Sequence, residues 1–399
     1  MTWSLRIGSV AGIGIFLHWT FIIIISVLFL LLLAGGDART AIGVVAFILT
    51  LFGCVLLHEL GHALCARRYG IGTKDITLLP IGGLARLERM PTQPSQEFWV
   101  AVAGPAVNVG IAAILALFVL LIQGAAGLTD ISLLRDPEQE FGGNLLAKLM
   151  WINIFLVVFN MLPAFPMDGG RVLRAALATR LPYHKATRVA ATVGQAMAIF
   201  FAFAAFLPGV SPLLLFIAIF VFLGAQAEAH YAETQYALKG LKVRDAMLTH
   251  FRTLSENDSL GDAVDELLAG SQHDFPIIRG DEFIGLLSRQ HLMQALSDHD
   301  RNAPVTVGMT RQFHSLSEDD DLETLQEALR MGEATTMPVM NEGRLCGLLT
   351  KENLMELIMI HSALAENRGG ERVREILRRG REHAGRPSFD DPGDPRTGL

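Results

Sequence analysis

The sequence predicts a polytopic α-helical membrane domain followed by an α/β module, and three observations indicate this. Residues 1–230 carry only 14 Lys and Arg and 11 Asp and Glu, so about 11% of them are charged, against roughly 25% in a typical soluble protein. Residues 231–399 carry the remaining 19 basic and 29 acidic residues, about 28%. This second half also contains an internal repeat. The contrast excludes one large soluble domain, a fibrous chain and a basic nucleic-acid-binding protein.

Six apolar stretches in the first half approach or reach the roughly 20 residues that a helix needs to cross a bilayer. They cover residues 16–34, 41–66, 98–123, 145–163, 190–207 and 212–230. The last two are joined by a short turn over 208–212, which predicts a helical hairpin. The segment 78–87 lacks a helical pattern, and we expect a short membrane-associated β strand with a bend at Gly82 and Gly83.

Basic residues predict the orientation of this domain. Five lie between residues 67 and 89 and five between 171 and 188, whereas the loops between these segments hold one each, Arg39 and Arg135. Basic loops face the cytoplasm. We therefore expect a multi-pass protein of the cell membrane with both termini, and the module that follows, in the cytoplasm. The long first apolar run favours a retained anchor over a cleaved signal peptide.

The second half repeats itself at a constant offset of 62 residues. Residues 253–256, 275–277, 285–288 and 291–293 match residues 315–318, 337–339, 347–350 and 353–355. In each unit an amphipathic helix (260–270, 322–332) precedes an apolar strand (275–278, 337–340). These boundaries predict a membrane domain over 1–230, a linker over 231–242 and two units over 243–300 and 301–366. The tail 367–399 lacks apolar periodicity and is predicted to be disordered.

The second apolar stretch contains His58-Glu59-Leu60-Gly61-His62. Residues four apart lie on one face of a helix, so both imidazoles can bind one metal ion. Glu59 adjoins the first ligand and can act as a general base on water. Polar side chains among apolar residues in a membrane are costly and therefore usually functional. The three cysteines, Cys54, Cys65 and Cys346, are too scattered for a thiolate zinc site.

A catalytic zinc ion needs a third protein ligand. Asp168 is the preferred candidate because it lies at the cytoplasmic end of the fourth stretch, at the depth of the two histidines. Proline breaks this helix and Gly169-Gly170 permits a turn that presents the carboxylate. The other candidates at that depth are His18, Glu97, Glu228 and His230.

Two motifs together resemble the site-2 protease family of intramembrane zinc metalloproteases. They are the HELGH motif at residues 58–62 and the segment 160-NMLPAFPMDGG-170 in the fourth stretch. The resemblance covers about residues 1–230. It implies one zinc ion per chain, held by His58, His62 and Asp168, with Glu59 as the general base. It also implies a membrane-anchored protein substrate, cleaved in or near its transmembrane segment.

The same resemblance implies weaker sites. Asn108, in a small-residue motif of the third stretch, is expected near the substrate, with a packing amide as the alternative. Asn160 is expected to contact the substrate backbone, with a helix-stabilising role as the alternative. Gly82 and Gly83 belong to a segment that in this family can pair with an unwound substrate as an added strand.

The repeat resembles a tandem pair of CBS domains. This implies an α/β fold, dimerisation and an adenine nucleotide such as ATP as a candidate ligand. In such pairs a Ser or Thr is followed three residues later by an Asp that holds the ribose. Here Ser288 and Thr350 supply the hydroxyls, but His291 and Asn353 replace the Asp. Ser288, Thr350 and Asn353 are the candidate nucleotide contacts, and a role in folding and dimerisation alone is the alternative.

Two other functions fit parts of the sequence. A CBS-regulated transporter or channel would use the His and Asp cluster as a metal-transport site, and an inactive family member would act as a membrane chaperone. Glu59 discriminates against the transporter, because a transport site does not need a non-ligating base between its histidines. The intact set of four chemical residues argues against the inactive protein.

Overall fold

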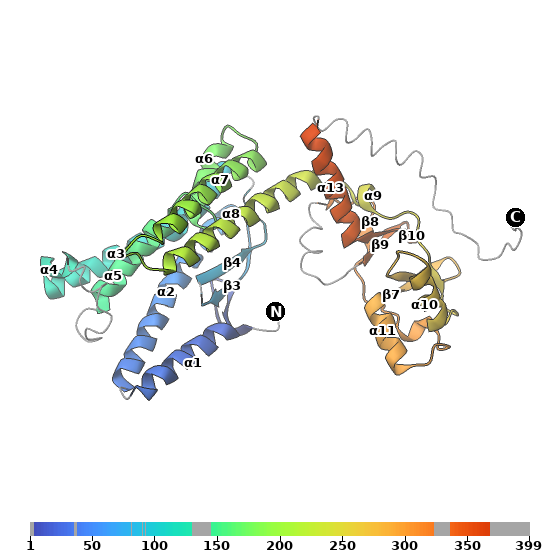
Figure 1. The fold of residues 1–399 in the computed structure, drawn as a ribbon, viewed down its shortest axis with the longest axis horizontal. Coiled ribbons are helices and arrows are strands. Elements are labelled where there is room, and N and C mark those ends of the chain that lie inside the picture. Colours follow the sequence, from blue (N-terminus) through green and yellow to red (C-terminus); the bar gives the residue numbers. More distant parts are fainter. Residues whose placement is uncertain are drawn as a thin grey trace, which may run out of the picture. The chain divides into compact units, whose positions relative to one another are not determined.

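The computed structural model describes residues 4–35, 38–80, 82–89, 91, 93–129, 145–322 and 336–367, with side chains described as far as residue 360. The chain divides into two compact units, Met1–Ala232 and Glu233–Leu399 (Figure 1). The predicted tail and the predicted helix beyond residue 322 lie outside the described residues.

Six apolar helices of the first unit lie where the sequence predicts membrane spans. They are α1 (Trp19–Ala34), α2 (Ala38–Arg68), α3 (Pro94–Gln123), α5 (Leu145–Asn160), α7 (Tyr183–Ala204) and α8 (Leu213–Leu238). Helices α2, α3, α7 and α8 are long and apolar enough to cross a membrane, whereas α1 and α5 have 16 residues each. Large apolar side chains such as Leu121 and Phe203 point outward, as a surface solvated by lipid requires. The chain is therefore a membrane protein.

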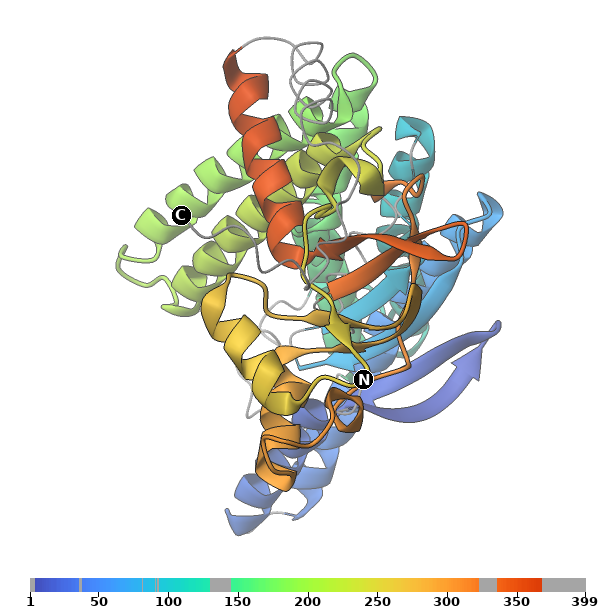
Figure 2. The same cartoon turned by 90° about the vertical axis from the view of Figure 1, so that its right-hand side faces the viewer.

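The β structure is larger than the single predicted strand. Strands β3 (Thr73–Leu79) and β4 (Gly82–Leu87) form an antiparallel hairpin, and β1 (Ser4–Val10) and β2 (Ile13–His18) form another. Together they make a four-stranded sheet in the order β1-β2-β3-β4, in which β2 and β3 are parallel. In Figure 2 the β1–β2 hairpin is the dark blue pair of arrows.

The prediction of one strand over 78–87 was therefore wrong in its extent. Strand β1 alternates polar and apolar residues only over residues 4–7, before Gly8 and Ser9 interrupt the pattern. So short an alternation is a weak strand signal. Strand β2 pairs with β3 across more than fifty residues of chain, and no local pattern encodes such a partner. A cross-strand pair supports the β3–β4 hairpin, because Arg86 Nε donates to Asp75 Oδ1 at 2.7 Å, which raises the pKa of Arg86.

Two short helices complete the first unit. Helix α4 (Ala125–Thr129) follows α3, and α6 (Asp168–Ala178) lies between α5 and α7. Figure 1 shows α1 and α2 as a hairpin, with β3 and β4 beside α2.

The second unit contains two three-stranded sheets that repeat one pattern. The first repeat consists of β5 (Leu254–Ser255), α10 (Leu260–Ala269), β6 (Phe275–Arg279), β7 (Glu282–Leu287) and α11 (Arg289–Asp298). The second consists of β8 (Leu316–Ser317), β9 (Thr336–Asn341), β10 (Arg344–Thr350) and α13 (Lys351–Asn367). Two single turns, α9 (Val243–Ala246) and η2 (Val305–Val307), precede the repeats. Equivalent strands pair in equivalent registers, since Leu254 lies opposite Ile277 and Leu316 opposite Val339.

The two repeats exchange their leading segments. Leu248, which precedes the first repeat, forms a β-bridge with Leu348 of the second, and Thr310, which precedes the second repeat, forms one with Leu286 of the first. Each repeat therefore completes the sheet of the other, and the pair is one folding unit.

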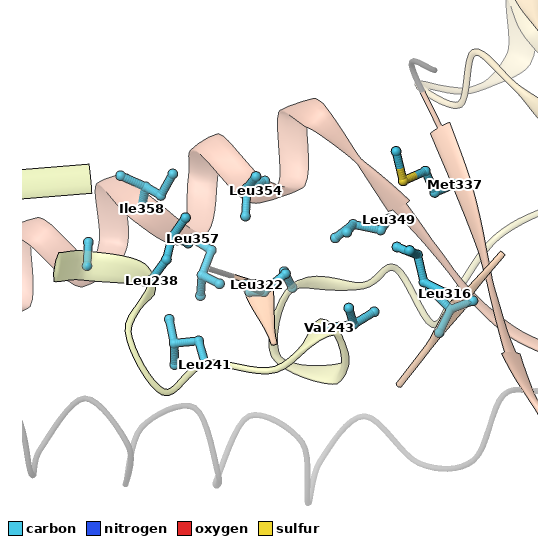
Figure 3. Packing of buried hydrophobic residues seen from close by; sticks show 13 residues of the cluster. Leu238, Leu241, Val243, Leu316, Leu322, Met337, Leu349, Leu354, Leu357 and Ile358 are labelled. Atoms are coloured by element: carbon cyan, nitrogen blue, oxygen red, sulfur yellow. The ribbon is translucent and has the colours of Figure 1, made fainter. Parts of the chain in front are cut away.

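The end of α8 packs into the core of this second unit (Figure 3). Leu238 and Leu241 lie against Leu354, Leu357 and Ile358 of α13. Apolar burial of this kind, worth about 25 cal/mol per Å², anchors the connecting segment 233–242 to the module.

Candidate active site

His58 and His62 occupy one face of α2, one turn apart, and both are buried. Their Nε2 atoms lie 3.1 Å from each other. This is the arrangement that the spacing of the motif predicts, because an α-helix brings side chains at positions i and i+4 together.

Asp168 joins this pair from another part of the fold. It is the first residue of α6, where the helix dipole favours a carboxylate. Its Oδ2 lies 3.2 Å from His58 Nε2 and 3.1 Å from His62 Nε2. Within the part of the chain that the structure describes, these three residues form the one group of His, Cys, Asp or Glu side chains able to hold a metal ion.

The outer nitrogens of both histidines are fixed by α3. His62 Nδ1 lies 2.7 Å from the carbonyl oxygen of Val100, and His58 Nδ1 lies 3.1 Å from Oδ1 of Asn108. A carbonyl only accepts hydrogen bonds, so Nδ1 of each ring carries the proton and Nε2 presents its lone pair.

Two imidazole lone pairs and a carboxylate oxygen therefore converge on one point. Such a set repels itself unless a cation binds. Zinc with bonds of about 2.0–2.1 Å separates its tetrahedral ligand atoms by roughly 3.3 Å, close to the spacings found here. The donor types and their spacing fit zinc, and three protein donors leave the fourth tetrahedral position that a catalytic site keeps open.

Gly104 of α3 faces the Nε2 atoms of the two histidines. A β-carbon at this position would overlap the His62 imidazole and lie 2.8 Å from His58 Nε2. On α2, Gly61 is as close to α3, since an added β-carbon would lie 2.8 Å from the Ala103 carbonyl oxygen. These two glycines let the helices approach closely enough for α3 to support the histidine rings, as the small-residue motif of the third stretch predicts.

Glu59 follows His58 on α2 and is half-buried. Strand β4 covers it at Gly83, where an added β-carbon would lie 2.5 Å from Glu59 Cγ. Gly82 begins the strand with φ of +143°, a backbone conformation that favours glycine. The structure therefore brings the two glycines of the predicted β segment to the edge strand that borders the candidate base.

The other candidates for the third ligand lie elsewhere. Glu97 on α3 and Glu228 on α8 both contact Arg174 of α6. His18 caps α1, where its Nδ1 accepts from the backbone N–H of Thr20, and His230 is exposed on α8.

Of the two asparagines expected near the substrate, Asn108 is 1% exposed and contacts His58. Asn160 is the last residue of α5, just before the loop that leads to Asp168. A substrate contact of either residue stays a prediction. The contact of Asn108 with His58 was missed at the sequence level, although Val100, Gly104 and Asn108 recur at the spacing of one helix face.

The candidate nucleotide residues lie at helix N-termini in the second unit. Ser288 caps α11, with Oγ accepting from His291 N–H at 3.2 Å. Thr350 Oγ1 accepts from Asn353 N–H at 3.1 Å at the start of α13, and its hydroxyl donates to Asn353 Oδ1. All three side chains therefore have local partners.

Comparison with known proteins gives the class of this site. The model of Peptidase family M50 matches residues 46–141 and 138–201, and that of the CBS domain matches residues 243–298 and 305–360. A zinc metalloprotease of Methanocaldococcus jannaschii is 31% identical over 362 residues, covering 90% of this chain and 97% of the relative. The putative zinc metalloprotease Rip3 of Mycobacterium tuberculosis is 27% identical over 386 residues, covering 90% and 93%.

Among solved structures, a site-2 protease from Methanocaldococcus jannaschii is 33% identical and covers 57% of this chain and 95% of its own, with a TM-score of 0.41. The relatives and the metal-ligand geometry together define a zinc metalloprotease built on apolar helices. The chain belongs to peptidase family M50, the site-2 protease family, and carries a tandem pair of CBS domains.

Proposed function

We propose that this metalloprotease is an intramembrane endopeptidase that cleaves membrane-anchored proteins in or near their transmembrane segments. The observation that carries the proposal is the position of the His58, His62 and Asp168 cluster. Its two histidines lie on the apolar helix α2, beside Glu59, a carboxylate that does not belong to the cluster. A charged group at such a site has a large desolvation cost, so its presence there indicates a function.

In this proposal His58, His62 and Asp168 hold one zinc ion, which when bound supplies an acidified water and polarises the scissile carbonyl. Glu59 would accept a proton from the attacking water and return it to the leaving amine. Asn108 and the Val100 carbonyl orient the two imidazoles through their Nδ1 atoms.

The substrate must be unwound, because a helix conceals its peptide carbonyls in hydrogen bonds. Strand β4 is an edge of the four-stranded sheet and contacts Glu59 through Gly83. An extended substrate segment added to β4 would therefore place its backbone next to the base. Asn160 is proposed as a further contact, since it precedes the loop to Asp168.

The basic residues of the loops support a cytoplasmic position for both termini and for the CBS pair. There the pair would regulate the protease as an adenine-nucleotide sensor and as a homodimer contact. The hydroxyls of Ser288 and Thr350, with the Asn353 amide, are the proposed nucleotide contacts. Binding of labelled ATP or AMP to the full chain, lost in Thr350→Val, tests the sensor. Absence of nucleotide binding would contradict the sensor role. A monomer in solution would contradict the dimer contact.

The test of the proposed activity compares wild type with Glu59→Gln in membranes that contain a single-span reporter. Both proteins should bind one zinc ion per chain, because glutamine leaves the three ligands in place. Cleavage by the variant should fall by roughly 10²–10⁴-fold, the usual contribution of a general base. Glu88→Gln makes the same chemical change after β4, away from the cluster, and serves as the matched control.

Other outcomes separate the alternatives. A wild type without zinc contradicts the proposed ligand set. Zinc binding with metal flux across a vesicle that is insensitive to Glu59→Gln would favour the transporter.

A further inference from the structure

Arg174 is a buried arginine in the membrane unit that the proposed chemistry does not use. It lies on α6, six residues after Asp168, and is 2% exposed. Its Nε donates to Glu97 Oε1 at 2.7 Å, and its Nη1 donates to Glu228 Oε1 at 2.5 Å. A buried arginine with carboxylates from two other helices carries a large desolvation cost, so an apolar residue would be the cheaper way to fill this space.

The same guanidinium also lies against two aromatic rings. Its Cζ is 4.9 Å from the ring centroids of both Phe165 and Tyr183, a distance at which a cation is attracted to the ring. Phe165 belongs to the loop just before Asp168, and Tyr183 begins α7. Arg174 therefore joins α3, α6, α7, α8 and the loop in one contact.

Helix α3 connects this cluster with the metal ligands. Glu97, Val100, Gly104 and Asn108 recur at intervals of three or four residues, so they share one face of the helix. Glu97 holds Arg174, whereas the other three contact His62 or His58. One face of α3 thus contacts both histidines and the helix that begins with Asp168.

The loop over residues 161–167, just before Asp168, is also tightly packed. An added β-carbon at Gly170 would lie 2.7 Å from Ala164 C, and one at Gly194 would lie 3.2 Å from Ala164 Cα. One at Gly224 would lie 2.6 Å from Pro166 Cδ. Helices α6, α7 and α8 therefore enclose this loop, and their relative positions decide where Asp168 stands.

We propose that Arg174 is a positioning residue for the metal ligand Asp168, acting through Glu97 and Glu228. The two histidines are held together by a single helix, so α2 alone sets their spacing. Asp168 reaches them from α6, so its distance depends on the packing of α6 against α3 and α7 and on the link from Arg174 to Glu228 of α8. The ion pairs of Arg174 fix that packing. This inference rests on the proposed ligand set.

The test measures metal binding in the full-length protein, purified in detergent. Glu97→Gln replaces the carboxylate by an amide of the same shape, and Arg174→Lys keeps the charge but loses the planar fork. Arg180→Met removes an exposed arginine just beyond α6 and is the matched control. Zinc affinity is obtained by competition with a chelator, and the visible spectrum of the Co²⁺-loaded protein reports the ligand geometry.

We expect Glu97→Gln to lower zinc affinity by roughly 10–100-fold, as the loss of a supporting contact around a metal site usually does. The Co²⁺ spectrum should change with it, while protease resistance and gel-filtration behaviour stay those of the wild type. Arg174→Lys should retain more affinity than Arg174→Met, and Arg180→Met should behave as wild type.

Two results would overturn the inference. One is an unchanged affinity and Co²⁺ spectrum in folded Glu97→Gln and Arg174→Lys. The other is loss of zinc only in proportion to loss of folded protein, which a merely structural role predicts. A wild type that does not bind zinc would instead refute the proposed ligand set, so the two failures are distinguishable.

Discussion

At the scale of single residues, the proposed metal site depends on groups that would not bind the metal themselves. His58 and His62 supply nitrogens, but the Asn108 amide and the Val100 carbonyl direct them. Gly104 contributes only the absence of a side chain, which lets α3 come within contact of both rings.

Gly104→Ala should therefore abolish tight zinc binding without unfolding the protein. The added methyl group would overlap the His62 imidazole, so the rings or the helices must move, and overpacking of this kind costs about 1–3 kcal/mol. Zinc content measured by mass spectrometry checks this. Gly110→Ala, on the same helix but with open space around it, should keep its zinc. Full zinc occupancy in Gly104→Ala would contradict this prediction, because it would show that α2 and α3 can move apart without loss of the site.

At the scale of elements, α2 carries the proposed catalytic residues, whereas β4 borders them. Helix α2 carries the two histidines and Glu59 within five residues, so local geometry alone sets their relation. Strand β4 approaches Glu59 from the sheet, and its position depends on pairing with β3 and, through it, with β2.

Gly83→Ala should separate substrate handling from metal binding. The new methyl group would lie against Glu59 Cγ and displace the edge strand, so reporter cleavage should fall at least about tenfold, a barrier increase of roughly 1.4 kcal/mol. Zinc content should remain at the wild-type level, because the proposed ligands lie on α2 and α6 and not on β4. Gly53→Ala on α2, which has open space, should leave both unchanged. Loss of zinc in Gly83→Ala would contradict this division of roles.

At the scale of the molecule, the C-terminal unit is built from two repeats that complete each other. Gly347 lies beneath the segment before the first repeat, with Met247 Sδ 2.6 Å from an added β-carbon. Gly285 lies in the equivalent place beneath Met309 and Thr310. Residues 62 apart in the sequence therefore make equivalent contacts where each leading segment reaches the other repeat.

Gly347→Val and Gly285→Val should each destabilise the whole pair, by roughly 1–3 kcal/mol, and to a similar extent. Either change displaces a leading segment from the other repeat, so neither repeat keeps a complete sheet. Urea unfolding followed by limited proteolysis of the full chain should show one shifted transition for the pair. Gly270→Ala, where the new contacts are ordinary, is the control. Two separate transitions would refute the mutual dependence of the repeats.

Much of this protein was determined by sequence alone because the signals are local. Apolar length located the six helices, a fixed offset revealed the tandem module, and the HELGH spacing placed two imidazoles on one helix face. The tertiary structure decided what depends on distant partners. It formed the four-stranded sheet, brought Asp168 to the histidines across more than one hundred residues, and assigned Glu97 and Glu228 to Arg174. A sequence shows which side chains can bind a metal ion, but only packing sets which of them meet.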